Sequence, residues 1–245
     1  MKKFYVLALV LVFVMVAAVA FAGISTTKHN LTATGNSLSI HTTDTAATLC
    51  GFCHIPHGGN TSVTNAPLWG RQIRNTLATA YNVYGGGHTL ANTTVNQPGT
   101  NSLTCLSCHD GTIALGVNYK NGVSTAGYTM VVGSGDVAGY LSGNALAVAG
   151  GQSYEPNIAG STGNDLTNDH PVGLQYAGTG AVGSPAGLAA LATATGRGFK
   201  FYGAGSNIME CASCHDPHTT NAKFKRDPSA FGYAGDFCVA CHELK

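Results

Sequence analysis

Cys50-Gly51-Phe52-Cys53-His54 is the first of four pentapeptides that share one pattern, two cysteines separated by two residues and followed at once by histidine. The other three are Cys105-Leu106-Ser107-Cys108-His109, Cys211-Ala212-Ser213-Cys214-His215 and Cys238-Val239-Ala240-Cys241-His242. Together they use all 8 cysteines of the 245-residue chain. Because no cysteine lies outside the pattern, its chemistry is expected to decide how the chain folds.

The spacing within each pentapeptide is typical of covalent haem attachment. Two intervening residues let both thiols reach the two vinyl groups on one porphyrin edge, and the next residue then lies over the iron as its proximal ligand. The sequence therefore predicts four c-type haems, bound through thioethers to Cys50, Cys53, Cys105, Cys108, Cys211, Cys214, Cys238 and Cys241. The predicted proximal iron ligands are His54, His109, His215 and His242.

Three other interpretations of the cysteines fit the pattern less well. Four disulfides are the default for an even cysteine count in an exported protein, but they do not require strict pairing at this spacing. Structural zinc uses pairs of Cys-x-x-Cys, but it does not need a histidine after every second cysteine. A thioredoxin-like redox site needs a surrounding βαβ pattern, which none of the pairs has.

Six histidines lie outside the pentapeptides and are candidates for the distal iron ligands. With only Met130 and Met209 remaining beyond the N-terminal leader, histidine is expected on both sides of each iron, which keeps reduction potentials low. The favoured distal candidates are His57, His218, His170 and His29, and the weaker ones are His88 and His41. For each of them the alternative is an ordinary surface histidine.

His57 and His218 each follow a proximal histidine by three residues, in Cys-His-Ile-Pro-His and Cys-His-Asp-Pro-His. This step places both imidazoles on one side of the chain, so the second imidazole is expected to bind the iron of a neighbouring haem. His170 is the one histidine in the long cysteine-free stretch, and His29 lies near the start of the expected mature chain.

The first residues predict export. Lys2 and Lys3 precede an apolar run from Phe4 to about Ala22 that ends in the small-x-small site Ala20-Phe21-Ala22. We expect a cleaved signal peptide over residues 1–22 and a single tetrahaem domain over 23–245, in the periplasm or outside the cell. An uncleaved anchor is the alternative, because the run approaches the ~20 residues that span a bilayer. No second such run follows, so no membrane span is expected in the mature form.

Composition points to a fold with a weak conventional core. Charged residues make up only 9% of the chain, with 12 basic against 11 acidic side chains, which gives no basic surface for nucleic acid. We expect mostly irregular structure with a few short helices and short strands, organised by the haems. A Gly-rich insert over 111–205 separates the second and third motifs, with strands expected over 128–132 and 145–148 and a helix over 185–195. The insert is expected either to pack against neighbouring subunits or to form a loose loop.

Two further expectations concern the surroundings of the haems. The third and fourth motifs begin only 27 residues apart, at Cys211 and Cys238, so their haems are expected to be close neighbours. Trp69, the single tryptophan, is expected to pack near a haem, although an ordinary core position is the alternative.

Several segments resemble the multihaem cytochromes of metal-reducing bacteria that carry doubled CxxCH motifs. The segments are Lys28-His29-Asn30-Leu31, 50–57, Pro67-Leu68-Trp69, 105–112, Asp169-His170-Pro171-Val172 and 211–218. Within that family the likeness is strongest to the tetrahaem extracellular cytochromes that polymerise into filaments. The resemblance implies stacked bis-His haems and a histidine of one subunit completing a haem in the next, with His57 and His29 as the positions that could do so.

The expected function is electron transfer without transformation of a substrate, rather than enzyme catalysis. The expected partners are other copies of the chain and redox proteins or extracellular acceptors. One alternative is a soluble periplasmic tetrahaem shuttle with the same chemistry. A second is a multihaem reductase of a small molecule, which would need one haem with an open coordination position.

Overall fold

The structure, a computed structural model, describes residues 22–35, 39–73, 80–84, 95–125, 127–134, 140–142, 144–147, 156–176, 187–226 and 236–242. Nearly all of the expected signal peptide and His88 lie outside these ranges. In the part of the chain that is described, no helix combines the length and the apolar character that crossing a membrane requires.

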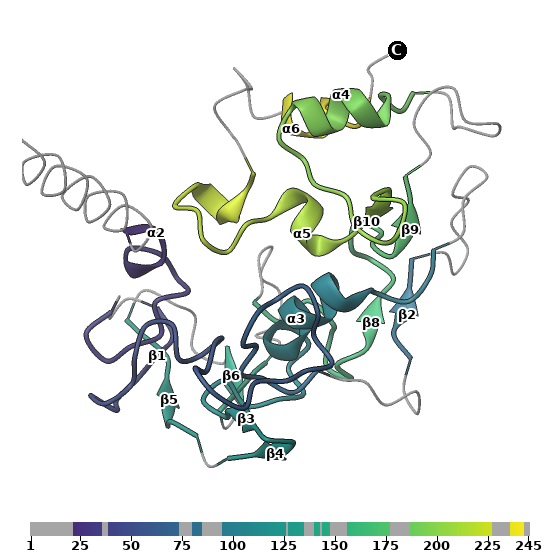
Figure 1. Cartoon of the computed structure of the whole chain (residues 1–245). Coiled ribbons are helices and arrows are strands. Elements are labelled where there is room, and N and C mark those ends of the chain that lie inside the picture. Colours follow the sequence, from purple (N-terminus) through teal and green to yellow (C-terminus); the bar gives the residue numbers. More distant parts are fainter. Residues whose placement is uncertain are drawn as a thin grey trace, which may run out of the picture.

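Short helices and very short strands are joined by long irregular segments (Figure 1), as the composition predicts. The helices are α2 (Ala22–Ser25), α3 (Thr100–His109), α4 (Leu191–Gly196), α5 (Cys211–Cys214), the 3-10 turn η1 (Ala222–Phe224) and α6 (Asp236–Val239). The strands are β1 (His41–Thr42), β2 (Asn82–Val83), β3 (Tyr119–Lys120), β4 (Val123–Ser124), β5 (Met130–Val131), β6 (Leu141–Ser142), β7 (Ala145–Leu146), β8 (Asp165–Leu166), β9 (Leu174–Gln175) and β10 (Ile208–Met209).

The strands form two-stranded sheets only, with no larger sheet among the described residues. Four pairs are antiparallel, β1–β5, β9–β10, β3–β4 and β6–β7, and β2–β8 is parallel. Isolated two-stranded pairs are marginal in water, so these pairs depend on what they pack against.

The described part of the insert over 111–205 contains short strands that pair with the rest of the same chain, so it is not a loose loop, and the expected packing against neighbouring subunits stays a prediction. Its strand β5 pairs with β1, β8 with β2, and β9 with β10, so it is tied to segments on both sides of it. β5 and β7 fall within the predicted strands 128–132 and 145–148. The predicted helix over 185–195 is shorter, because α4 begins at Leu191 and Leu188 instead bridges to His242. Residues 185 and 186 lie outside the described ranges.

The buried apolar side chains gather in four small clusters, each of which contains or contacts a residue in or beside a cysteine motif. Cys241 lies in the first cluster, where Tyr176 and Phe201 pack, and Cys53 contacts the second and the fourth. Leu106 lies in the third cluster. One spacer residue of every motif is almost fully buried: Phe52, Leu106, Ser213 and Ala240. The motifs are therefore the points around which the core is built.

A single buried carboxylate joins α3 and α5, the two helices that carry the second and third motifs. The backbone N–H of Gly99, the N-cap of α3, donates to Glu210 Oε1 at 3.0 Å, and Ser102 donates a short hydrogen bond to Glu210 Oε2. The Cys211 N–H in turn donates to Ser102 Oγ at 3.0 Å. A Cβ at residue 99 would overlap Glu210 Oε1, so glycine is required there for this close approach. The clamp fixes how the two helices sit against each other.

Replacing Ser102 with alanine should destabilise the mature protein, because it leaves the buried Glu210 carboxylate without its hydroxyl donor. The expected loss is about 1–3 kcal/mol of unfolding free energy in chemical denaturation. Ser124→Ala is the matched control, since its hydroxyl makes only a long, exposed bond to Gln72, and it should cost within about 0.5 kcal/mol. Equal stability of the two variants would contradict the clamp.

A haem-free chain should not fold cooperatively, because four small apolar clusters and two-residue strands bury little surface against the conformational entropy of the chain. Replacing all eight cysteines with serine provides this chain. We expect thermal scans by circular dichroism to show no sharp transition, and a cooperative melt would show that the polypeptide alone specifies the fold.

Candidate haem sites

Each of the four motifs forms a single helical turn. The histidine N–H of the first, third and fourth motifs donates to the carbonyl of that motif's first cysteine, at 2.8, 3.1 and 2.8 Å, and the second motif is the last turn of α3. This i to i−4 step places the first cysteine and the histidine on one face of the turn. All eight cysteines are free thiols in the structure. The backbone geometry therefore suits one ligand that is held by two sulfurs and one imidazole.

The motifs follow one another in space in the same order as in the sequence. Cys108 is near enough to Cys53 to contribute, after burial, to raising the pKa of Cys53 to about 12. The Cys105 and Cys211 thiols form a hydrogen bond, which together with burial raises the pKa of Cys105. The same hydrogen bond lowers the pKa of Cys211, against the opposing effect of burial.

The third and fourth motifs are also neighbours, as their spacing predicts. Cys214 packs against the cluster that contains Cys241, and burial, followed by the nearby Cys241, raises the pKa of Cys214 to about 12. α5 and α6 accordingly lie in the same half of the molecule (Figure 1). The four sites form one continuous series, from the first motif to the fourth.

Three of the four proximal histidines face a second imidazole from a distant part of the chain. The ring centroids of His109 and His29 are 6.1 Å apart, those of His54 and His218 are 6.3 Å apart, and those of His242 and His170 are 6.2 Å apart. Each pair combines one predicted proximal ligand with one favoured distal candidate, a pairing that sequence reasoning had left open.

The spacing of these pairs matches two imidazoles bound to opposite sides of one metal ion. A metal–imidazole bond is about 2.0 Å long and the ring centroid lies roughly 1.1 Å behind the nitrogen, so the two centroids are expected about 6.2 Å apart. Among the described residues, no three His, Cys, Asp or Glu side chains gather around one point. A macrocycle that supplies its own equatorial nitrogens needs only the two axial imidazoles.

Hydrogen bonds leave the Nε2 atoms of the motif histidines available as ligands. The Nδ1 atoms of His54, His109 and His215 lie 2.7, 2.6 and 2.8 Å from the carbonyl oxygens of Pro67, Pro156 and Lys223. Because a carbonyl only accepts, Nδ1 must donate, and the lone pair of a neutral ring is then on Nε2. Histidines that bind metals are held in this way by their second ring nitrogen.

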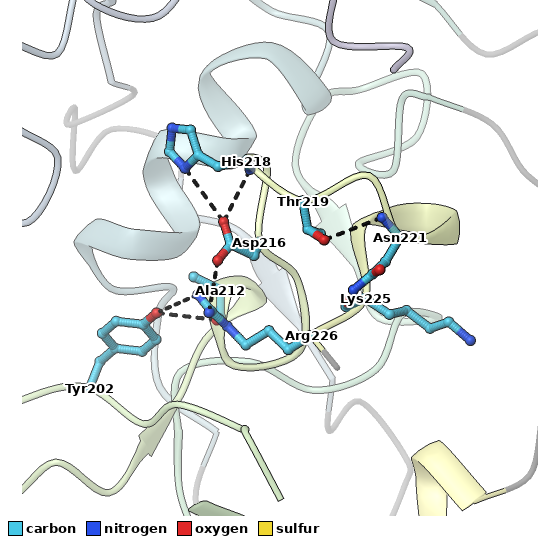
Figure 2. Close-up of polar contacts among 8 residues, drawn as sticks. All are labelled: Tyr202, Ala212, Asp216, His218, Thr219, Asn221, Lys225 and Arg226. Carbon is cyan, nitrogen blue, oxygen red and sulfur yellow. Dashed lines mark hydrogen bonds and ion pairs between the residues drawn. The ribbon is translucent and has the colours of Figure 1, made fainter. Parts of the chain in front are cut away.

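His218 is oriented by a carboxylate instead of a carbonyl (Figure 2). Its Nδ1 lies 3.4 Å from Asp216 Oδ1, and its backbone N–H donates to the same oxygen at 3.0 Å. Arg226 forms an ion pair with Asp216, with 3.1 Å between Nη1 and Oδ2. Arg226 also donates a hydrogen bond to the Ala212 carbonyl inside the third motif. The third motif thereby positions the imidazole that faces His54 of the first.

The buried imidazoles are held in the neutral form that binds metals. Burial, aided by the nearby His109, lowers the pKa of His29 to about 4, and burial also lowers the pKa of His109 and of His170. His29 is further fixed by stacking on Phe224, with ring centroids 4.1 Å apart. Such rings carry a free lone pair at neutral pH without first having to lose a proton.

The third motif is the exception, because none of the described imidazoles faces His215. Two candidates within the described residues remain outside any histidine pair. His57 is exposed, and His41 is half-buried with its Nδ1 2.8 Å from the Ser39 carbonyl. His88 lies outside the described ranges. The described residues therefore bring three of the four motif histidines to a favoured distal candidate, and no such candidate among them is brought to His215.

Trp69 lies against the first motif and also belongs to the fourth apolar cluster, so it holds a core position beside a predicted haem site. Its indole meets the His54 ring edge-on, with centroids 5.8 Å apart, and the backbones of the two residues form a bridge. The indole N–H is buried and has no protein partner. An unsatisfied buried donor at this place is what a bound group with acceptor atoms would complete.

Sequence reasoning named the candidate ligands but missed the residues that hold them in place. Asp216 stands inside the quoted Cys-His-Asp-Pro-His segment, where an acid two residues before a histidine was a usable signal. Glu210 and Arg71 carry no sequence signal, because their roles arise from contacts with segments far away in the chain.

No protein-family model matches this chain, and its sequence has no significant match among curated proteins.

Proposed function

We propose that this chain is an exported tetrahaem c-type cytochrome that transfers electrons. The observation that carries the proposal is the set of three imidazole pairs, each with its centroids 6.1–6.3 Å apart and each joining a Cys-x-x-Cys-His histidine to a predicted distal histidine. Three independent pairs at the spacing of bis-imidazole ligation favour haem over disulfide or zinc chemistry.

The polypeptide holds and insulates the cofactors. When bound, each haem supplies an iron that cycles between the ferric and ferrous states. The cysteine thiols of each motif would anchor one macrocycle, and at the first, second and fourth motifs the paired imidazoles would both be used as iron ligands, which would exclude exogenous ligands there. The carbonyls that accept from Nδ1 fix ring orientation and raise ligand basicity. The contiguous series of motifs supports transfer from site to site along the chain.

Assembly of copies into an extracellular filament is supported by the unpaired His215 and the exposed His57. A motif histidine that no described imidazole faces is complemented by an exposed histidine that has no ring partner among the described residues. We propose that His57 of one copy completes the third-motif haem of the next. His29, the other position considered for this role, faces His109 of its own chain instead.

The same open position favours the reductase as the second candidate. If the iron that His215 would bind has no sixth ligand, a small molecule can bind that iron, as in enzymes that use one open haem. A soluble shuttle results instead if His88 or His41 closes the site within one chain. Neither alternative changes the chemistry proposed for the other three sites.

Replacing His29 with alanine should open the haem of the second motif. We expect the reduced variant to bind one more equivalent of carbon monoxide per chain than the wild type, because an axial position loses its imidazole. Lys120→Ala, at an exposed residue that carries no iron-ligand candidate, is the control and should add no such binding. Equal carbon monoxide binding by wild type and His29→Ala would contradict the proposed pairing.

His57→Ala tests the assembly. If His57 bridges copies, electron microscopy should show filaments for the wild type and isolated particles for the variant, with one additional haem that binds carbon monoxide. Filaments of normal length in the variant would exclude the bridge. Monodisperse wild-type particles would exclude the filament and leave the shuttle or the reductase.

A further inference from the structure

Arg71 is the largest fully buried side chain among the described residues, with 0% of its surface exposed. Four backbone carbonyls enclose its guanidinium. Nη1 donates to the carbonyl oxygens of Leu115 at 2.6 Å and Val117 at 3.3 Å. Nη2 donates to the carbonyl oxygens of Ser107 at 3.0 Å and Ala114 at 3.1 Å. Because arginine does not lose its proton in proteins, the site holds a permanent positive charge.

The charge of Arg71 has no acidic partner among the described residues. Its four partners are neutral carbonyls, and its Nε–H is buried with no acceptor. Asp110, a buried acid of the same region, accepts from the Tyr81 hydroxyl at 2.8 Å and from Thr112. A buried cation without a counter-ion is costly, and its field extends further than that of a surface charge, because little water screens it.

The position of Arg71 is between the first and second motifs. The preceding residue, Gly70, donates its N–H to the Cys53 carbonyl at 2.7 Å, and Ser107 belongs to the second motif itself. The guanidinium is therefore fixed to both attachment turns by the backbone.

We propose that Arg71 is a fixed charge that raises the reduction potentials of the haems bound at the first and second motifs. The inference rests on the proposed tetrahaem function. Reduction adds one negative charge to each centre, and a nearby cation in a medium of low dielectric stabilises the reduced form. Asp110 offsets part of this field at the second site, but it does not alter the change caused by removing the Arg71 charge.

Arg71→Gln removes the charge and keeps an amide that can donate to the carbonyls. The midpoint potentials of the four haems are measured by spectroelectrochemical titration, with the haems assigned by NMR. We expect the reduction constants of the first and second haems to fall by about tenfold, which is about 59 mV for a one-electron couple. Lys120→Gln makes the same charge change at an exposed site and should leave all four potentials in place.

A second variant tests the electrostatic effect on the haem potentials while Arg71 and its hydrogen bonds are left unchanged. Val117→Glu adds a carboxylate to the segment whose carbonyl already accepts from Arg71, and it should lower the same two potentials, whereas Val117→Gln should not. A structural role for Arg71 alone predicts no difference between these two. Four haems with unchanged potentials in both Arg71→Gln and Val117→Glu would overturn this inference alone. Wild-type protein without covalent haem would overturn the proposed function as well.

Discussion

Two imidazoles that face each other at 6.1–6.3 Å, from segments far apart in the sequence, are the constraint on which the rest of this structure depends. His29 joins the N-terminal segment to the end of α3, His218 joins the third motif to the first, and His170 joins the insert to the fourth. In the proposed holoprotein each pair closes on one iron. The three links together connect every major segment of the chain.

This arrangement explains how a chain with so little regular structure holds one conformation. Strands of two residues and four small apolar clusters contribute little cohesion by themselves. In the proposed holoprotein, coordination and thioether bonds would supply cohesion at the same places where the clusters lie, because at least one spacer residue of each motif is buried in the protein. Buried polar contacts fix the positions of the motifs relative to one another. Glu210 fixes α3 against α5, and Arg71 fixes the first motif against the second.

The sequence predicted what the motif spacing determines. The irregular fold and the proximity of the third and fourth motifs follow from composition and spacing, and three of the favoured distal candidates, His29, His170 and His218, lie beside motif histidines. The partner of each histidine did not, because pairing depends on how segments distant in sequence pack. α3 was also missed, since Thr, Asn, Ser and Cys are weak helix formers and tertiary contacts to Glu210 and Cys211 hold that region. His57, favoured as a ligand on the same local ground as His218, is exposed and has no ring partner among the described residues.

A cryo-electron microscopy map of the matured protein, at a resolution that shows axial ligands, tests the central claim most directly. The account predicts iron ligated by His54 with His218, by His109 with His29 and by His242 with His170, and a third-motif iron that takes its sixth ligand from His57 of an adjoining copy. A map in which these histidines bind irons in other combinations, or in which the four cysteine pairs carry no haem, would contradict it.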